Sequence, residues 1–305
     1  MIVPINNAIN SSIIDYDARE FIRISRITDS TQIRAVSDLC RELKVNNLWD
    51  KFIYIYPFIY VNGYTNSMYV ELKSRQIGLT ESSSGNDITY SSTGVKFNQG
   101  KVLEQTSLSV QPGELTEAGP GHISVYTRLN SITQSSYDTY TPVNGYFNTT
   151  GAGLGAGWVA YSFGTQSVKF SFMYTGISSS NSGLKWQTFT TSTNTSGLWI
   201  YSSNSENNGL TASTQNPFTY SLSQNGQIQY TFSNTRQYTG FGTIIAIGGG
   251  NYLTYSNKSL DEICWYSVGW SGSPTWSGGR IIETNKHEIL YNIIQKFQTT
   301  LGRQV

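Results

Sequence analysis

The amino-acid sequence predicts a mainly β protein, an antiparallel β-sandwich of the jelly-roll type with one helix near each end of the chain. Three observations predict this fold. Between residues 90 and 280, apolar and polar side chains alternate in short stretches that Gly, Asn and Ser separate. The same region has no stretch in which apolar residues recur at helical spacing. Residues 27–60 and 281–305, in contrast, each contain such a stretch.

The first segment, residues 1–26, shows no apolar periodicity, and we expect an extended N-terminal arm that either packs on a neighbouring subunit or frays. Residues 27–60 are expected to form a helix followed by a strand. The helix covers TDSTQIRAVSDLCRELKVNNLW, with Asp29 as its cap, Gln32 reaching back as a capping box, and an end at Asn46 and Asn47. The following KFIYIYPFIYV is rich in aromatic and β-branched residues and predicts a strand, which Pro57 confines to an edge or a bend.

Residues 61–280 are expected to form the sandwich itself. The stretch VKFSFMY alternates as a half-buried strand does, and FTYSLSQNGQIQYTF predicts a hairpin. A two-residue Asn-Gly turn would place Leu222 opposite Gln229 and put the two apolar sets on opposite faces. A three-residue loop, Gln224-Asn225-Gly226, pairs Leu222 with Ile228 and keeps one apolar face, so we predict that loop.

Residues 281–305 predict a helix that belongs to the same globular unit. Asn285 and Glu288 are placed to cap it, and Gly302 is placed to end it. One apolar stripe runs along it, formed by Ile289, Leu290, Ile293, Ile294, Phe297 and Leu301. Such a stripe should lie against the N-terminal helix or the back of the sandwich, which would join both chain ends in one helical layer.

The composition argues against several partners. Only 13% of the 305 residues are charged and the net charge is +1, so no long-range field favours nucleic acid or an anionic membrane. The apolar runs are too short to span a bilayer, and MIVPINNAIN lacks the regions of a signal peptide, so we expect a soluble protein that is not secreted. The two cysteines, Cys40 and Cys264, are expected to be buried free thiols.

Four segments carry a family resemblance: ITDSTQIRAVSDLCRELKVNNLWDKFIYIYPF, YSSTGVKFN, HISVYTRLNS and LYNIIQKFQTTLGRQV, whose closing FQTTLGRQV is the most specific part. In this order they resemble a family of tailed-bacteriophage virion structural proteins built around a concanavalin A-like, or LamG-like, jelly roll. The resemblance implies a protein of the virion surface, made in the host bacterial cytoplasm, that decorates the capsid or forms part of a tail appendage. It implies other virion proteins and copies of the same chain as partners. The expanded loop VGWSGSPTWSGGR departs from the family pattern.

We expect no catalytic residues, and we do not expect the protein to be an enzyme. The acid spacing E-x-D-x-x-E of jelly-roll glycoside hydrolases is absent, and His122 and His287 have no second His or Cys at ligand spacing. We expect His122 to be a buried structural residue and His287 to be exposed or capping. No cofactor is predicted apart from calcium, which LamG-type domains often hold at one rim. Asp138, Glu206 and Asp261 are the candidate calcium ligands, with ordinary solvated loop acids as the alternative.

Two tryptophans are the candidate binding residues. Trp270 and Trp276 lie among Gly, Ser and Pro, and such rings stack on sugar faces or contact a neighbouring virion subunit. Trp199 and Tyr201 alternate within a strand-like stretch and are expected in the core. Three hypotheses follow: a virion structural protein, a receptor-binding adhesin that recognises bacterial surface polysaccharide, and a polysaccharide depolymerase, the last disfavoured because a paired acid is missing.

Overall fold

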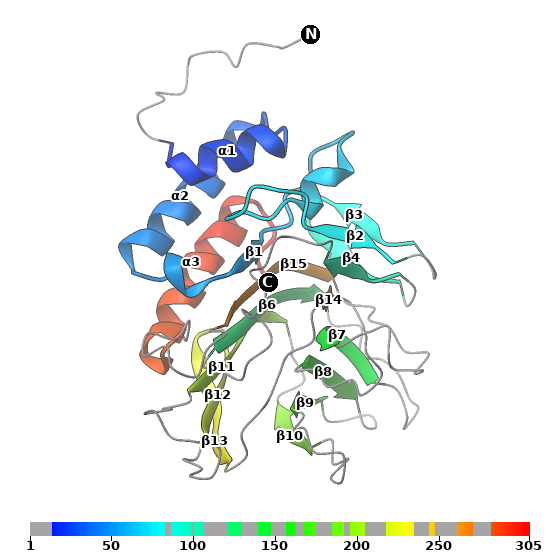
Figure 1. Ribbon diagram of the computed structural model, residues 1–305, viewed down its shortest axis with the longest axis vertical. Coiled ribbons are helices and arrows are strands. Elements are labelled where there is room, and N and C mark those ends of the chain that lie inside the picture. Colours follow the sequence, from blue (N-terminus) through cyan, green and yellow to red (C-terminus); the bar gives the residue numbers. More distant parts are fainter. Residues whose placement is uncertain are drawn as a thin grey trace.

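The fold is an antiparallel β-sandwich with a layer of helices against one of its two sheets, as the sequence predicts (Figure 1). It is seen in a computed structural model that describes residues 14–82, 87–98, 101–105, 121–129, 140–147, 157–162, 168–174, 185–191, 196–204, 218–234, 244–247, 262–270 and 282–305. All strand pairings within these ranges are antiparallel.

The sheet that carries the helices, called here the helix-backed sheet, has the strand order β13-β12-β11-β6-β15-β4-β3, and β1 pairs with β15 off this path. The strand β15 therefore lies at the centre, flanked by β6 along most of its length and by β4 and β1 at its two ends. The bounds are β1 Tyr54–Tyr56, β3 Thr89–Ser91, β4 Gly94–Lys96, β6 Gly121–Leu129, β11 Gly197–Asn204, β12 Phe218–Gln224, β13 Gln227–Asn234 and β15 Glu262–Trp270.

The second sheet has the order β10-β9-β8-β7-β14-β5-β2. The late strand β14 lies between β5 and β7, just as β15 lies between β4 and β6, so each sheet is completed in its middle by a late part of the chain. The bounds are β2 Leu79–Glu81, β5 Leu103–Gln105, β7 Tyr140–Phe147, β8 Gly157–Ser162, β9 Val168–Tyr174, β10 Lys185–Thr191 and β14 Ile244–Ile247.

The β12–β13 hairpin corrects the predicted three-residue loop. Gln224 pairs with Gln227 across a two-residue turn in which Asn225 and Gly226 both have positive φ, at 51° and 78°. A bulge then adds one residue to β13, so that Leu222 pairs with Tyr230 instead of Gln229. Beyond the bulge, the apolar residues of the two strands lie on one face of the hairpin, as expected. The bulge in β13, and not a longer loop, places them there.

At the N-terminus, part of the predicted extended arm is a helix. Residues 16–24 form α1 (Tyr16–Ile24), and Asp15 caps it by accepting from the amides of Asp17 and Ala18. Phe21 and Ile22 are buried, so packing holds this short helix in place where its weak sequence pattern does not predict one. Residues 1–13 lie outside the described ranges.

The second helix agrees with the prediction. It is α2 (Ser30–Val45), capped by Asp29, which accepts from the amide of Gln32, and it ends at Asn46, followed by Asn47 with a φ of 54°. The capping box is half formed, because the Gln32 side chain donates to the carbonyl of Tyr60 instead of reaching back. The short 3-10 turn η1 (Trp49–Lys51) follows, and β1 then ends immediately before Pro57.

The C-terminal helix is α3 (His287–Thr300), which a 3-10 turn, η3 (Thr284–Lys286), precedes. The predicted cap is wrong, because Asn285 lies within η3 and no side chain caps α3. Gly302, with a φ of 69°, ends the helix as predicted, and Arg303 N donates to Gln298 O across this end.

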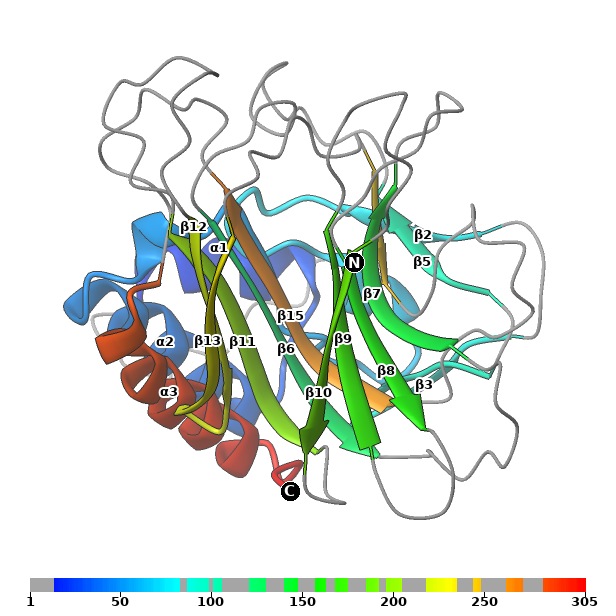
Figure 2. The ribbon, with the colours of Figure 1, turned by 90° about the horizontal axis from the view of Figure 1, so that it is seen from below.

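The two chain ends form one helical layer, as expected. Figure 2 shows α2 and α3 along one face of the helix-backed sheet, with β7–β10 of the second sheet on its other side. One apolar cluster joins α1, α2 and α3 to β6, β11 and β15, through residues such as Leu43, Ile294, Phe297, Ile200 and Trp265. Trp199 and Tyr201 are buried, as predicted.

Both cysteines are free and buried, as predicted. Burial raises the pKa of the Cys264 thiol to about 12 and that of Cys40 well above its ordinary value, so neither is a reactive thiolate at neutral pH. Within the described ranges, no helix is both long and apolar enough to cross a lipid bilayer.

Candidate functional site

Most of the residues predicted to form a site lie outside the described ranges. Asp138, Glu206 and Asp261, the candidate calcium ligands, are among them, and so is Trp276. Trp270 is the last residue of β15, and its backbone pairs with Gly121, so it ends a strand instead of lying inside the expected loop. Calcium binding and glycan contact through these residues therefore stay predictions.

The two histidines are both structural. His287 is fully buried, which corrects the expectation that it is exposed or caps the helix. Its Nε2 lies 2.9 Å from the Ser202 hydroxyl and 3.1 Å from the Ile282 carbonyl, and its Nδ1 lies 2.9 Å from the Ser223 hydroxyl. Burial lowers the pKa of His287 to about 4, so the ring is neutral at physiological pH. It therefore ties the start of α3 to β11 and β12.

His122 is buried on the same face of the sheet, in agreement with the sequence. Its ring packs edge-on against Phe52, with ring centroids 4.9 Å apart. Gly269 lies beside it, and a Cβ added there would come within 1.8 Å of the Lys51 carbonyl and 2.5 Å of the His122 ring. The chain between α2 and β1 is therefore pressed directly onto β15, where only glycine fits.

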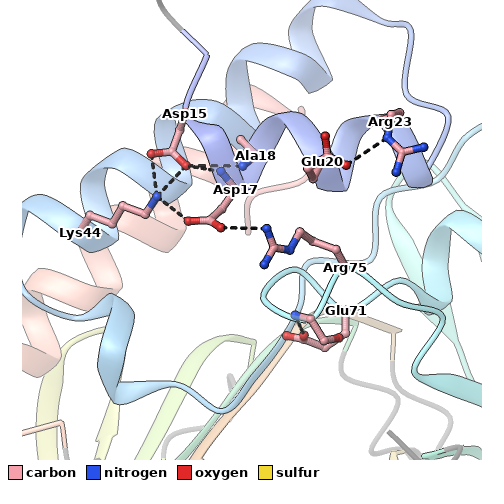
Figure 3. Close-up of polar contacts among 9 residues, drawn as sticks. Asp15, Asp17, Ala18, Glu20, Arg23, Lys44, Glu71 and Arg75 are labelled. Atoms are coloured by element: carbon pink, nitrogen blue, oxygen red, sulfur yellow. Dashed lines mark hydrogen bonds and ion pairs between the residues drawn. The ribbon is translucent and has the colours of Figure 1, made fainter. Parts of the chain in front are cut away.

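Figure 3 shows a group of charges where α1 and α2 meet a turn of the chain, which we call the helix-junction cluster: Asp15, Asp17, Lys44 and Arg75. Lys44, near the end of α2, donates to both carboxylate oxygens of Asp15 at 2.8 Å and pairs with Asp17 at 2.6 Å. Arg75 reaches Asp17 from a separate turn at 3.4 Å. Partial burial by itself lowers the pKa of Lys44, but the hydrogen bonds to Asp15 and Asp17 outweigh it and raise the pKa.

The turn that carries Arg75 is held from below by Glu71, also drawn in Figure 3. The buried Glu71 carboxylate accepts from the Ile55 amide at 2.6 Å and from the Ser74 amide. Burial raises the pKa of Glu71, and these backbone donors counteract part of the rise. Lys73 donates to the carbonyls of Trp49 and Phe52, at 2.9 and 2.7 Å. The Glu71 and Lys73 side chains thus hold backbone groups of this part of the chain in place.

A second group of polar residues lies at the edge where both sheets end, and we call it the edge cluster: Tyr69, Glu81, Tyr90, Lys101 and Asp87. The Tyr90 hydroxyl donates to Glu81 Oε1 at 2.8 Å, and the Tyr69 hydroxyl lies 3.0 Å from the same oxygen. Lys101 pairs with Glu81 at 3.0 Å and with the exposed Asp87 at 2.7 Å. Since Glu81 belongs to β2 and Tyr90 to β3, the cluster joins the last strands of the two sheets.

The acid–base properties of the edge cluster do not suit hydrolysis. Partial burial by itself raises the pKa of Glu81, but hydrogen bonds from Tyr90, Lys101 and Tyr69 outweigh it and lower the pKa. The hydrogen bond from Lys101 also lowers the pKa of Asp87. Both carboxylates are therefore ionised, whereas glycoside hydrolysis needs one protonated acid of raised pKa. Burial raises the pKa of Tyr69 to about 12, which keeps its hydroxyl protonated.

The closing stretch FQTTLGRQV, the most specific part of the sequence resemblance, is anchored by three buried residues, Phe297, Gln298 and Arg303. The Arg303 side chain is 1% exposed and donates to Gln298 Oε1, Phe58 O and Pro57 O at 2.6, 2.8 and 2.6 Å. It also donates to Cys264 O at 3.2 Å. The arginine thus joins the end of the chain to the segment after β1 and to β15. The amide of Val305 donates to the Tyr126 hydroxyl on β6, at 3.2 Å.

Among the described residues, no group of three or more His, Cys, Asp or Glu side chains is arranged to hold a metal ion. The Asp15, Glu71 and Lys296 side chains, for example, cap a helix, hold a turn and join two helices.

No protein-family model matches the chain, and no curated protein matches it. Among solved structures it is similar to the binding domain of botulinum neurotoxin serotype G, with 12% identity and a TM-score of 0.48, over 80% of this chain and 51% of that chain. The chain thus spans about half the length of that neurotoxin domain.

Two smaller structures are also similar. One is domain 4 of AbnA, a GH43 extracellular arabinanase from Geobacillus stearothermophilus in complex with arabinotriose, with 11% identity and a TM-score of 0.44, over 78% of this chain and 96% of that chain. The other is the CBM2 module of an evolved Dit from Lactobacillus casei BL23 phage J-1, with 10% identity and a TM-score of 0.39, over 74% and 97%. At these scores the comparisons carry no functional argument, and the sandwich rests on the strand order described above.

Proposed function

We propose that this chain is a non-enzymatic structural protein of a bacteriophage particle, placed on the virion surface as a capsid decoration or a tail appendage. One observation supports this proposal above the others. The four segments that carry the sequence resemblance, although far apart in the chain, come together around β15. They supply α2 with β1, the β3–β4 pair, β6, and α3 with its closing residues.

The contacts within this unit explain why these segments belong together. Arg303 donates to the backbone of the segment after β1, Gln295 on α3 accepts from the Tyr126 hydroxyl on β6, and β1 and β4 both pair with β15. The four segments that carry the resemblance therefore contact one another in one part of the fold, and they are not scattered over its surface. A rigid body closed by both chain ends suits a protein that must persist on the outside of a particle.

The electrostatics of the described residues support a role without catalysis. The one described carboxyl group whose pKa is raised, Glu71, is fully buried and bound to backbone amides. The paired carboxylates of the edge cluster are ionised, and both histidines are buried. Neither arrangement provides an acid facing a substrate.

Localisation on the particle is the direct test. A cryo-EM map of the intact virion, with mass spectrometry of the same purified particles, should place this chain on the outer surface in several symmetric copies. Particles that lack the chain, or an internal position for it, would contradict the proposal.

Binding of bacterial surface polysaccharide is the finer part of the proposal, and Trp270 and Trp276 are the residues to test. Replacing both with alanine should reduce binding of the purified protein to host cells or to a glycan array, since stacking of aromatic rings on sugar faces would be lost. Tyr16→Ala is the matched control, because Tyr16 is an aromatic side chain, 67% exposed, on the helical layer. Equal binding by all three proteins would remove the two tryptophans from any glycan site.

A depolymerase role is tested separately, by incubating the protein with capsular polysaccharide and measuring new reducing ends. We expect none above background. Release that an alanine at one loop acid, such as Asp138 or Asp261, abolishes would overturn the proposed lack of catalysis.

A further inference from the structure

Among the described strands, four lie at the edges of the two sheets, and they differ in how well they resist pairing with another chain. A sheet edge exposes unpaired backbone donors and acceptors, and natural proteins protect it with short strands, charged residues or proline. In the second sheet, β2 has three residues and ends in Glu81, while β10 begins with Lys185. In the helix-backed sheet, β3 also has three residues. These three edges therefore carry the usual protection.

The remaining edge, β13, lacks this protection. It has eight residues, QIQYTFSN, with no charged side chain and no proline. Among the described strands it pairs with β12 alone. The side chains of Gln227, Ile228, Gln229 and Thr231 are all exposed. The bulge lies next to the turn, and the residues from Tyr230 to Asn234 continue in regular register.

The direction of the free backbone groups follows from the register. In an antiparallel ladder every second residue directs its amide and carbonyl toward the neighbouring strand, and Gln224 does so where it closes the two-residue turn. Ser221 and Thr219 are out of phase with Gln224, so their partners on β13, Thr231 and Ser233, direct their backbone groups away from β12. The open side of β13 thus presents a regular series of donors and acceptors.

An apolar surface adjoins this edge. Gly226 at the hairpin tip lies against the first turn of α3, where a Cβ added to it would come within 2.8 Å of the Glu288 Cα. Just beyond this contact on each element are Ile228, 41% exposed, and Ile289, 36% exposed. Large apolar side chains beside an unprotected edge are typical of a surface that a partner covers.

We propose that β13 is the site of homo-oligomerisation, where a second copy of this chain adds its own β13 in antiparallel orientation. The helix-backed sheet would then continue across a two-fold axis. Antiparallel pairing of identical strands is self-complementary, and a two-fold axis places equivalent residues close to each other. A charged residue in the strand would meet its own copy there, which destabilises the pair, so the neutrality of β13 suits this partner. The inference rests on the proposed multimeric virion role and names its surface.

Two substitutions at one exposed position test the pairing. Thr231→Pro removes an amide that faces away from β12, so the hairpin keeps its ladder while the added strand loses a donor and meets the proline ring. Thr231→Lys places like charges across the two-fold axis. The control is Thr80→Lys, which puts the same charge on an exposed threonine of the protected edge β2.

The measurement is sedimentation-velocity ultracentrifugation of the full chain over a range of concentrations, with thermal melting to check that each variant is folded. We expect a reversible dimer for the natural chain and for Thr80→Lys. For both Thr231 variants we expect dimerisation weakened about tenfold or more in Kd. In the natural chain, hydrogen exchange of the Thr231 and Ser233 amides should slow as the concentration rises.

A natural chain that stays monomeric at high concentration would overturn the inference, and so would a dimer that neither Thr231 variant weakens. If the natural chain is monomeric, the partner that pairs with β13 would be an extended segment of a different virion protein. Either result is compatible with a virion position shown by cryo-EM, so failure here is distinct from failure of the proposed function.

Discussion

Removing the Arg303 side chain should destabilise the whole protein, although the residue is third from the end of the chain. The variant is Arg303→Met, which keeps an unbranched apolar stem and removes the guanidinium. Pro57 O, Phe58 O and Gln298 Oε1 then lose donors at 2.6, 2.8 and 2.6 Å. Cys264 O keeps a contact with Gln298 at 3.4 Å. Burial lowers the pKa of Arg303 to about 10, so the group that is removed is charged at neutral pH.

The magnitude follows from the three acceptors. A buried acceptor left without its donor costs about 1–3 kcal/mol, so three predict about 3–9 kcal/mol. Removing a charge that was itself desolvated returns part of this energy, and we expect a net loss of about 3 kcal/mol in the free energy of unfolding. In a protein of this size that corresponds to a fall of roughly 5 °C in Tm.

Urea denaturation followed by tryptophan fluorescence, with a thermal melt of the same samples, measures the loss. Lys296→Met is the matched control, because it removes an exposed charge from α3 that pairs with Glu42 on α2. That variant should change stability by about 0.5 kcal/mol or less. If Arg303→Met loses no more stability than the control, the hydrogen bonds of Arg303 do not stabilise the fold, and the predicted role of this side chain is refuted.

Two further variants test contacts between α3 and the sheet. The lowered pKa of His287 means that the unfolded chain binds its proton first, so acidification from about pH 6.5 to about pH 4 should reduce stability by about 3 kcal/mol. His287→Gln should flatten this dependence in urea midpoints measured across that range, and parallel curves for the two proteins would contradict the assignment. Gly226→Ala should cost at least about 1 kcal/mol more than Gly63→Ala in thermal melts. Both glycines have positive φ, but only at Gly226 does the new Cβ meet α3.

Local patterns accounted for most of the architecture. The alternation between residues 90 and 280 predicted the sandwich. The Asp29 cap and apolar stripe predicted α2, and the apolar stripe with Gly302 predicted α3, although its predicted cap was wrong. Such patterns are reliable because each side chain must face either the core or solvent, and the period of that choice differs between helix and strand. The helix α1 was not predicted because nine residues are too few to show a clear helical period. Packing of its buried residues holds this helix in place.

The candidate site was less accessible to sequence reasoning. His287 was expected at the surface because it opens a helix, yet its partners Ser202 and Ser223 lie 85 and 64 residues away. A hydrogen bond between such distant residues leaves no local pattern. The edge cluster was missed for the same reason, since the sequence gives no sign that Glu81 and the two tyrosines meet where the sheets end.

The sequence by itself determined the fold class, the positions of the two longer helices, and the presence of a specific C-terminal segment. All of these depend on residues that are close together in the chain. The tertiary structure alone decided that the hairpin uses a bulge, that Arg303 is buried among backbone carbonyls more than 200 residues away, and that β13 is left as the unprotected edge. These features depend on which strands become neighbours, and that is settled only when distant segments pack together.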